Sequence, residues 1–309
     1  MATSAHNRTL EFDDPYPSRT AARPALLPRR EPVVCGTAEA GPLAAERLQS
    51  YADNGFLTLG GLFADDEIAA WCDELASMRN DPALHAREET ITEPGSDEVR
   101  SIFAVHALGG LIARLCRDRR IVAIARQILG GDVYFHQTRV NYKPGFKGKP
   151  FYWHSDFETW HVEDGMPAMR ALSCSIALTP NTPHNGPLML IPGSHKQFLA
   201  CIGETPEEHY KQSLKVQEYG VPDHTSLAKM VETGGIVAPT GPAGSVIFFD
   251  CNVMHGSNSN ITPQPRSNVF IVFNRCDNAL DEPYCGLPPR PQFIANRQDF
   301  SPIKPSLRR

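Results

Sequence analysis

The sequence predicts a mainly β fold with flanking α-helices, in which a helical layer precedes the strands. Apolar residues recur at helical spacing in the first half of the chain, and this pattern ends at Gly130-Gly131. Short runs rich in Val, Ile, Phe and Tyr, bounded by Gly, Pro and Asn, follow from Asp132 onward. Helices followed by strands are typical of a β-sandwich supported by an N-terminal helical layer.

The predicted elements follow one another without an internal repeat. Helices are expected where apolar residues recur every three or four positions, and strands where short apolar runs lie between turn residues. The polar segment 203–232 is expected to be an insertion, in part helical, between two strands. The expected helices cover residues 42–54, 65–78 and 107–129, and the expected strands cover residues 56–59, 132–143, 170–179, 187–192, 245–250 and 267–275.

Residues 1–40 are expected to form an irregular N-terminal arm, and residues 41–309 a single domain. Four prolines between positions 15 and 28 break any helix in the arm. The sequence leaves open whether this arm is disordered or wraps around the domain. At 309 residues the chain is long enough to bury a sizeable core.

The bulk composition disfavours several kinds of partner. The net charge is −5 and the sequence pI about 6.1, so no nucleic-acid partner is expected. No apolar run approaches the roughly 20 residues that span a bilayer, so no membrane partner is expected. The polar segment 1–32 lacks the apolar centre of a secretory signal, and none of the eight cysteines forms a CxxC pair. A cytoplasmic protein with reduced thiols is therefore expected. A homodimer is compatible with the sequence, which does not decide the oligomeric state.

His154 and Asp156 stand two residues apart in the densest group of chemically active side chains. On an extended backbone, side chains two residues apart point to the same side, so this imidazole and this carboxylate can reach one metal ion. His255 follows an apolar strand later in the chain and precedes a Gly/Ser/Asn loop. Two histidines and one carboxylate on one face of a metal form the facial triad of iron(II) oxygenases, which leaves positions open for a co-substrate and dioxygen.

An H-x-D pair alone is weak evidence, because a lone strand histidine is usually structural. Arg266, in the segment Pro-Arg-Ser-Asn, strengthens it, since a bidentate guanidinium suits the distal carboxylate of 2-oxoglutarate. The alternative for Arg266 is a surface ion pair. His195 ends a strand-then-turn segment and is expected to lie in a loop rather than to bind the metal. The other histidines have no carboxylate at suitable spacing.

The block FYWHSDFETWHVEDGMPAM at residues 151–169 is the most specific feature of the chain. It resembles the signature of the ectoine hydroxylases, within the phytanoyl-CoA dioxygenase-like superfamily. One departure from that pattern is Gln264, where an aromatic residue would be expected before Pro-Arg. The resemblance also extends to residues 14–17, 100–106, 137–146, 170–181, 255–258 and 265–268.

The resemblance implies a double-stranded β-helix (jelly roll) with iron in its mouth. It implies hydroxylation of ectoine to 5-hydroxyectoine, a step in the synthesis of a protective solute under osmotic and heat stress, with Fe(II), 2-oxoglutarate and O2. The metal must carry this chemistry, since no side-chain acid or base can insert oxygen into an inert C–H bond. The resemblance implies His154, Asp156 and His255 as catalytic iron ligands; Asn141, Phe151, Ser257 and Arg266 around 2-oxoglutarate; and Gln137, Thr159, Trp160, Phe249, Asn268 and Phe270 near the substrate.

Physical chemistry agrees with some of these substrate roles. The amidinium of ectoine would be held well over aromatic faces such as those of Trp160 and Phe249. Gln137 and Thr159 can donate hydrogen bonds that orient the ring. Plain core packing is the alternative for both aromatic residues, and an ordinary strand position is the alternative for Gln137.

Two other functions are open at this stage. The first is the same chemistry on another substrate, such as proline, another free amino acid or a larger lipid-like acid. The second is a non-catalytic metal-binding β-barrel in which the three ligands hold zinc or nickel. Arg266 and Asn141 disfavour the second, because a closed structural site needs no co-substrate anchor.

Overall fold

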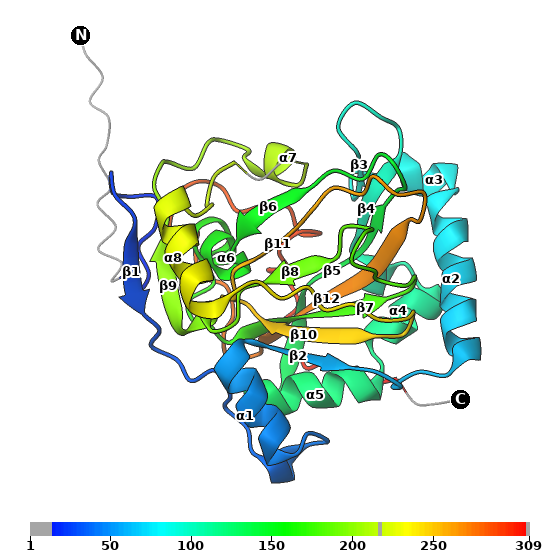
Figure 1. Ribbon diagram of the computed structural model, residues 1–309, viewed down its shortest axis with the longest axis horizontal. Helices are drawn as coiled ribbons and strands as arrows, with labels where there is room; N and C mark the ends of the chain where they lie inside the picture. Colours follow the sequence, from blue (N-terminus) through cyan, green and yellow to red (C-terminus); the bar gives the residue numbers. More distant parts are fainter. Residues whose placement is uncertain (1–13, 216–217, 307–309) are drawn as a thin grey trace.

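A computed structural model describes residues 14–215 and 218–306, and two antiparallel sheets form the centre of its fold (Figure 1). The larger sheet has seven strands in the order β2-β10-β7-β12-β5-β4-β3. The smaller sheet, in the order β6-β11-β8, faces it, so the prediction of a mainly β sandwich with helices is confirmed. The strands of these sheets are β2 (Phe56–Leu59), β3 (Thr90–Thr92), β4 (Val99–Phe103), β5 (Val133–Lys143), β6 (Phe151–His154), β7 (Ala171–Ala177), β8 (Leu188–Leu190), β10 (Val246–Asp250), β11 (His255–Ser257) and β12 (Arg266–Arg275).

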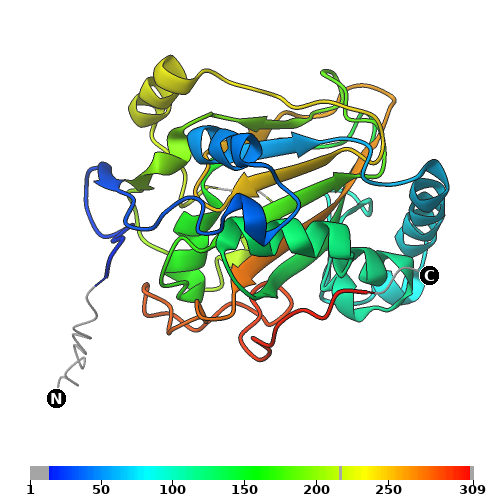
Figure 2. The ribbon, with the colours of Figure 1, turned by 90° about the horizontal axis from the view of Figure 1, so that it is seen from below.

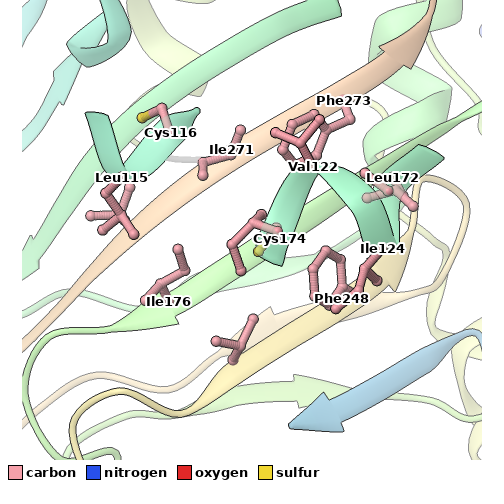
Figure 3. Close-up of a cluster of buried hydrophobic side chains, with 14 of the residues drawn as sticks. Leu115, Cys116, Val122, Ile124, Leu172, Cys174, Ile176, Phe248, Ile271 and Phe273 are labelled. Atoms are coloured by element: carbon pink, nitrogen blue, oxygen red, sulfur yellow. The ribbon is translucent and has the colours of Figure 1, made fainter. Parts of the chain in front are cut away.

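Helices cover the outer face of the larger sheet (Figure 2). In Figure 3, Val122 and Ile124 of the fifth helix pack over Leu172, Cys174 and other side chains of β7, β10 and β12. Burial of each large aliphatic side chain contributes about 1.5–3 kcal/mol, so this layer holds the larger sheet rigid. The helices are α1 (Ala45–Asn54), α2 (Asp65–Arg79), α3 (Pro82–His85), α4 (Gly110–Cys116), α5 (Arg119–Leu129), α6 (Asp156–Asp164), α7 (Tyr210–Ser213) and α8 (His224–Gly234), with short 3-10 turns at Ala38–Ala40, Val105–Ala107 and Ser194–Lys196.

The strand alternation of the larger sheet gives its inner face a polar character. In β5 the residues Val140 and Tyr142 pack under the helices, so the odd-numbered side chains from Gln137 to Lys143 face the smaller sheet. A β-bulge between Val272 and Phe273 of β12 lies opposite His136, where the side-chain alternation of β5 changes phase. The inner face therefore carries a row of polar and charged groups that can build a site.

The helix α6 was not expected, because the sequence around His154 and Asp156 was interpreted as a strand edge. Ser155 does keep an extended backbone, with φ −102° and ψ 129°, but Asp156 begins the helix. Every residue of α6 is buried, including four carboxylates. The helix ends at Gly165, whose left-handed φ of 75° closes the last turn.

The described part of the N-terminal arm lies against the domain. Within it, β1 (Ala25–Pro28) pairs antiparallel with β9 (Gln197–Ala200). The insertion predicted over residues 203–232 contains α7 and α8, as expected. All eight cysteines are free thiols, as expected. Among the described residues, no helix is long and apolar enough to cross a membrane.

Candidate active site

Three side chains meet where the smaller sheet joins α6. His154 ends β6 and His255 begins β11, and the two residues are direct partners across these strands. Their imidazole rings therefore lie 4.2 Å apart between centroids. The carboxylate of Asp156 lies between them, with Oδ1 3.7 Å from His154 Nε2 and Oδ2 3.9 Å from His255 Nε2. The three ligand atoms all lie within 4.8 Å of one another, which brings the predicted triad together.

Backbone carbonyls fix the tautomer of both histidines. The Nδ1 of His154 lies 2.7 Å from the carbonyl oxygen of Tyr152, and the Nδ1 of His255 lies 3.0 Å from that of Val253. Because a carbonyl only accepts hydrogen bonds, each Nδ1 carries the proton and each Nε2 keeps its lone pair. Both lone pairs are then available to one metal ion beside Asp156.

The electrostatics of the cluster also fit a metal ion. Burial and the neighbouring His255 lower the pKa of His154 to about 3, so this imidazole is neutral, as a metal ligand must be. Ser173 donates a hydrogen bond of 3.2 Å to Asp156 Oδ2, which helps to orient the carboxylate. No other His, Cys, Asp or Glu in residues 14–215 and 218–306 joins the cluster. Two imidazoles and one carboxylate on one side fit iron(II) with positions left open.

A group of cationic side chains lines the same cavity. Arg266 of β12 and Lys143 of β5 are direct partners across the sheet, and both line the cavity with His154 and His255. Arg100 lines it too, held by Glu93 at 2.9 Å. Among the residues that line the cavity, Glu93 carries the one carboxylate against the guanidinium groups of Arg266 and Arg100, and Lys143 adds a further positive charge when it is protonated, so this end of the cavity favours an anion.

The guanidinium of Arg266 is under-bonded for a buried charge. It donates one hydrogen bond of 3.3 Å to Asn268 Oδ1, and its buried Nε has no partner among the described residues. Burial and the charge of Arg100 lower the pKa of Arg266 to about 10. A carboxylate placed against this planar donor group would accept hydrogen bonds from the unpaired N–H groups and would neutralise the buried positive charge.

Besides Arg100, two basic residues of this cavity were not among the predicted site residues. Lys143 Nζ lies 3.0 Å from Ser257 Oγ and within hydrogen-bond distance of two backbone carbonyls. Arg139 donates to Gln137 Oε1 at 2.7 Å, and its guanidinium lies 5.1 Å from the centre of the Phe270 ring. Burial lowers the pKa of Arg139, against the opposing effect of Asp156. The odd-numbered alternation along β5 was the one signal in the sequence that could have placed both side chains beside Asn141.

The structure brings only some of the predicted site residues into the cavity of the triad. Asn141, which accepts a hydrogen bond of 2.7 Å from Ser101, lines it together with four other predicted residues. The predicted residues that line the cavity besides His154 and His255 are Asn141, Phe151, Ser257, Arg266 and Phe270.

The remaining predicted substrate residues do not line that cavity. Gln137 lines a separate cavity and donates to the Ile294 carbonyl at 2.8 Å. The ring of Phe249 lies 5.1 Å from that of His255, and Asn268 donates to Ser175 at 2.9 Å. On α6, Thr159 accepts from Arg19 at 3.4 Å, and Trp160 packs edge-on against His136 in a buried cluster.

Gln264 lies away from the cationic group. Its side chain is exposed, and its backbone carbonyl accepts hydrogen bonds from Asn260 and Thr262. The carbonyl contacts hold the loop that precedes Arg266 and do not depend on the side chain. The departure from the family's pattern therefore changes no residue that lines the cavity.

Comparison with known proteins places this geometry in a family. The sequence model of the phytanoyl-CoA dioxygenase family (PhyH) matches residues 51–268. The ectoine dioxygenase of Bordetella parapertussis is 61% identical over 293 residues, which cover 94% of this chain and 95% of that protein. The chain belongs to the ectoine dioxygenase family.

Solved structures agree with membership in the ectoine dioxygenase family. A crystal structure of EctD from S. alaskensis with 2-oxoglutarate and 5-hydroxyectoine matches with a TM-score of 0.87 and 48% identity, over 95% of this chain and 98% of that one. The same protein with bound Fe matches with a TM-score of 0.85 and 47% identity over the same shares. The double-stranded β-helix expected for the family is thereby confirmed.

Proposed function

We propose that this chain is an iron(II)- and 2-oxoglutarate-dependent dioxygenase that hydroxylates ectoine to 5-hydroxyectoine. The observation that carries the proposal is the convergence of His154, Asp156 and His255 on a cavity whose wall holds Arg266 and Lys143. A metal with open positions and an anchor for a dicarboxylate are the two parts that this chemistry requires. Relatives named ectoine dioxygenase at 52–61% identity support the substrate.

The cationic wall suits the co-substrate. Arg266 would hold the distal carboxylate of 2-oxoglutarate through two parallel N–H donors, with Lys143 and the Ser257 hydroxyl beside it. Asn141 and the Phe151 ring would confine the carbon chain. These contacts would fix the orientation in which the keto-acid end meets the metal.

The substrate brings a carboxylate and a delocalised amidinium into the same cavity. Arg139 offers a guanidinium to the substrate's carboxylate, and Phe270 offers an aromatic face. We place Phe249, Trp160, Thr159, Gln137 and Asn268 around the substrate as supporting residues. Gln137 acts in this scheme by holding Arg139.

Bound iron(II) would supply the activation of dioxygen that side chains cannot. The chain contributes the positioning of both substrates and the exclusion of water from the reacting carbon. Leu188, Leu190, Ile247 and Phe249 form an apolar cluster between the two sheets, next to the triad. This apolar cluster would help to exclude water from the reacting carbon.

The direct test is mass spectrometry of ectoine incubated with the enzyme, iron(II), 2-oxoglutarate and O2. We expect a product heavier by one oxygen atom, together with succinate in equal amount. Omission of 2-oxoglutarate is the control and should leave ectoine unchanged. Succinate release with proline or another small zwitterion, and none with ectoine, would favour the same chemistry on another substrate. No consumption of O2 under any condition would favour a non-catalytic metal-binding barrel.

Binding of 2-oxoglutarate is expected to take up a proton. Burial and the charges of Arg266 and Arg100 lower the pKa of Lys143 to about 6, so its amine is mostly neutral at pH 7.5 in the free enzyme. A bound carboxylate favours the ammonium form and raises this pKa. Affinity should therefore fall as the pH rises above about 6, because less of Lys143 is protonated. Isothermal titration in buffers of different ionisation enthalpy measures the uptake, and the variant Lys143→Met should lose it.

Three finer features complete the proposal. We place a single domain at residues 41–309, preceded by the arm at 1–40. Cytoplasmic location and a homodimer stay predictions, which cell fractionation and light scattering test.

A further inference from the structure

The helix α6 carries charge that its own sequence does not balance. Its nine residues from Asp156 to Asp164 are all buried, and four of them are carboxylates. Asp156 belongs to the triad, and Asp164 is held by Arg290 in a buried ion pair. Glu158 and Glu163 need partners from elsewhere, because a buried unpaired carboxylate costs several kcal/mol.

Arg19, in the N-terminal arm, provides that partner for both carboxylates. Its Nε and Nη2 lie 3.0 and 2.7 Å from the two oxygens of Glu158, and its Nη1 lies 2.7 Å from Glu163 Oε1. The side chains of all three residues are almost fully buried. This is a bidentate pair plus a second ion pair from one guanidinium, a geometry that lysine cannot reproduce.

Further contacts fix Arg19 itself. Its backbone N–H donates to the Cys201 carbonyl at 2.8 Å, and its φ of 58° is unusual for a residue with a side chain. The neighbouring Ser18 hydroxyl donates to Glu158 Oε1 at 2.6 Å. The arm thus holds this guanidinium in one place against α6.

The same cluster reaches the insertion that borders the cavity. His209 Nδ1 lies 2.7 Å from Glu163 Oε1, and Leu214 of that segment lines the cavity of the triad. Burial opposes the charge of Glu163, but the bond from His209 and the charges of Arg290 and Arg19 lower its pKa to about 2. Glu163 is therefore ionised, and it joins the arm, α6 and the insertion.

Arg19 also constrains a residue that we place near the substrate. Its Nη2 lies 3.4 Å from Thr159 Oγ1. A guanidinium has donors only, so Oγ1 is the acceptor in this contact. The Thr159 hydroxyl proton is then left for an acceptor other than Arg19.

We propose that Arg19 is a positioning residue of the active site: it fixes α6, and with it the metal ligand Asp156 and the hydroxyl of Thr159, through Glu158 and Glu163. The inference rests on the proposed function, since it assigns the arm a part in that reaction. Arg19 acts through α6 and is not placed in contact with the reacting atoms.

The test compares Arg19→Met and Arg19→Lys with Arg29→Met. Arg29 is a matched control, because it also lies in the arm and forms a buried 2.8 Å ion pair, with Asp250, but the hydrogen bonds of its side chain go to residues outside α6. We expect Arg19→Met to weaken iron(II) binding by the apoprotein about 10-fold, as loss of a group that orients a metal ligand does. Its kcat/KM for ectoine should fall about 100-fold, the effect of a small misplacement. The iron(II) affinity and the kcat/KM of Arg19→Lys should lie between those of Arg19→Met and the wild type. Arg29→Met should have a lower melting temperature but unchanged iron(II) affinity and kcat/KM.

A double variant separates stability from positioning. Arg19→Met with Glu158→Gln removes the charge of the carboxylate that Arg19 holds through two donors, while Glu163 keeps its contact with His209, so the melting temperature should recover in part while iron affinity and kcat/KM stay low. Anaerobic fluorescence titration measures the iron affinity without turnover. If Arg19→Met does not fold, the same titration is carried out on Arg19→Lys and on the double variant. Wild-type iron affinity in these folded variants, or an equal loss of it in Arg29→Met, overturns the proposal. Failure of the wild type to hydroxylate ectoine would instead contradict the proposed function.

Discussion

Replacement of His154 by alanine should abolish turnover that depends on iron(II). The change removes one of two imidazoles and leaves Asp156 and His255 as the remaining ligands. A pair of protein ligands holds a divalent metal far less tightly than three do, and it no longer restricts the metal to one face. We expect ectoine-dependent O2 consumption to fall to the level of the enzyme without iron.

His184→Ala is the matched control for this loss. His184 is exposed and lies outside the triad, so its replacement should leave iron affinity and turnover unchanged. Equilibrium dialysis of iron(II) against both variants separates loss of the metal from loss of folding. Full activity of the His154→Ala variant would remove this histidine from the ligand set.

Replacement of Arg266 by alanine should raise the KM for 2-oxoglutarate about 10- to 100-fold, since a hydrogen bond to a charged group contributes roughly 1.5–3 kcal/mol. The KM for ectoine should change much less, because Arg139, rather than Arg266, is proposed to bind its carboxylate. Steady-state kinetics with each substrate varied in turn measures both effects.

Arg266→Lys is the informative companion. It keeps the positive charge but loses the planar pair of donors, so its KM for 2-oxoglutarate should lie between those of the wild type and Arg266→Ala. An unchanged dependence on 2-oxoglutarate in both variants would assign the co-substrate anchor to another cation of the cavity, Lys143 first.

The two long strands of the site, β5 and β12, were predictable from local patterns, because polar and apolar residues alternate in β5 from Gln137 onward and β12 holds a run of Val, Ile and Phe. The short strands β6 and β11, which carry His154 and His255, were not among the expected strands. His154, Asp156 and His255 were predictable because metal chemistry demands those residue types at strand ends. Arg266 was predictable because the co-substrate of such a triad is an anion, and a guanidinium suits its distal carboxylate.

The helix α6 could not be predicted because it has no exposed face. A helix buried on every side shows no apolar stripe, and its carboxylates resemble those of a surface loop. The burial of Glu158 and Asp164 is stabilised by tertiary ion pairs, from Arg19 to Glu158 and from Arg290 to Asp164. These partners come from the two ends of the chain, and no local pattern relates them to α6.

Arg139 and Lys143 escaped for a similar reason. A cation in a strand is usually exposed at the surface. The alternation along β5 puts these two side chains on the face of Asn141, but it is the pairing of β5 with its neighbours that shows this face to point inward. The bulge opposite His136 changes which side chains face inward, and bulges leave little trace in sequence.

The account depends on three protein atoms sharing one iron ion. A crystal structure of the enzyme grown without oxygen, with iron(II) and 2-oxoglutarate, tests it most directly. We predict that Nε2 of His154, Nε2 of His255 and one oxygen of Asp156 are the protein's contribution to the metal, with the co-substrate's far carboxylate against Arg266. An imidazole of His255 turned away from the ion, or a fourth protein ligand on it, would contradict the account.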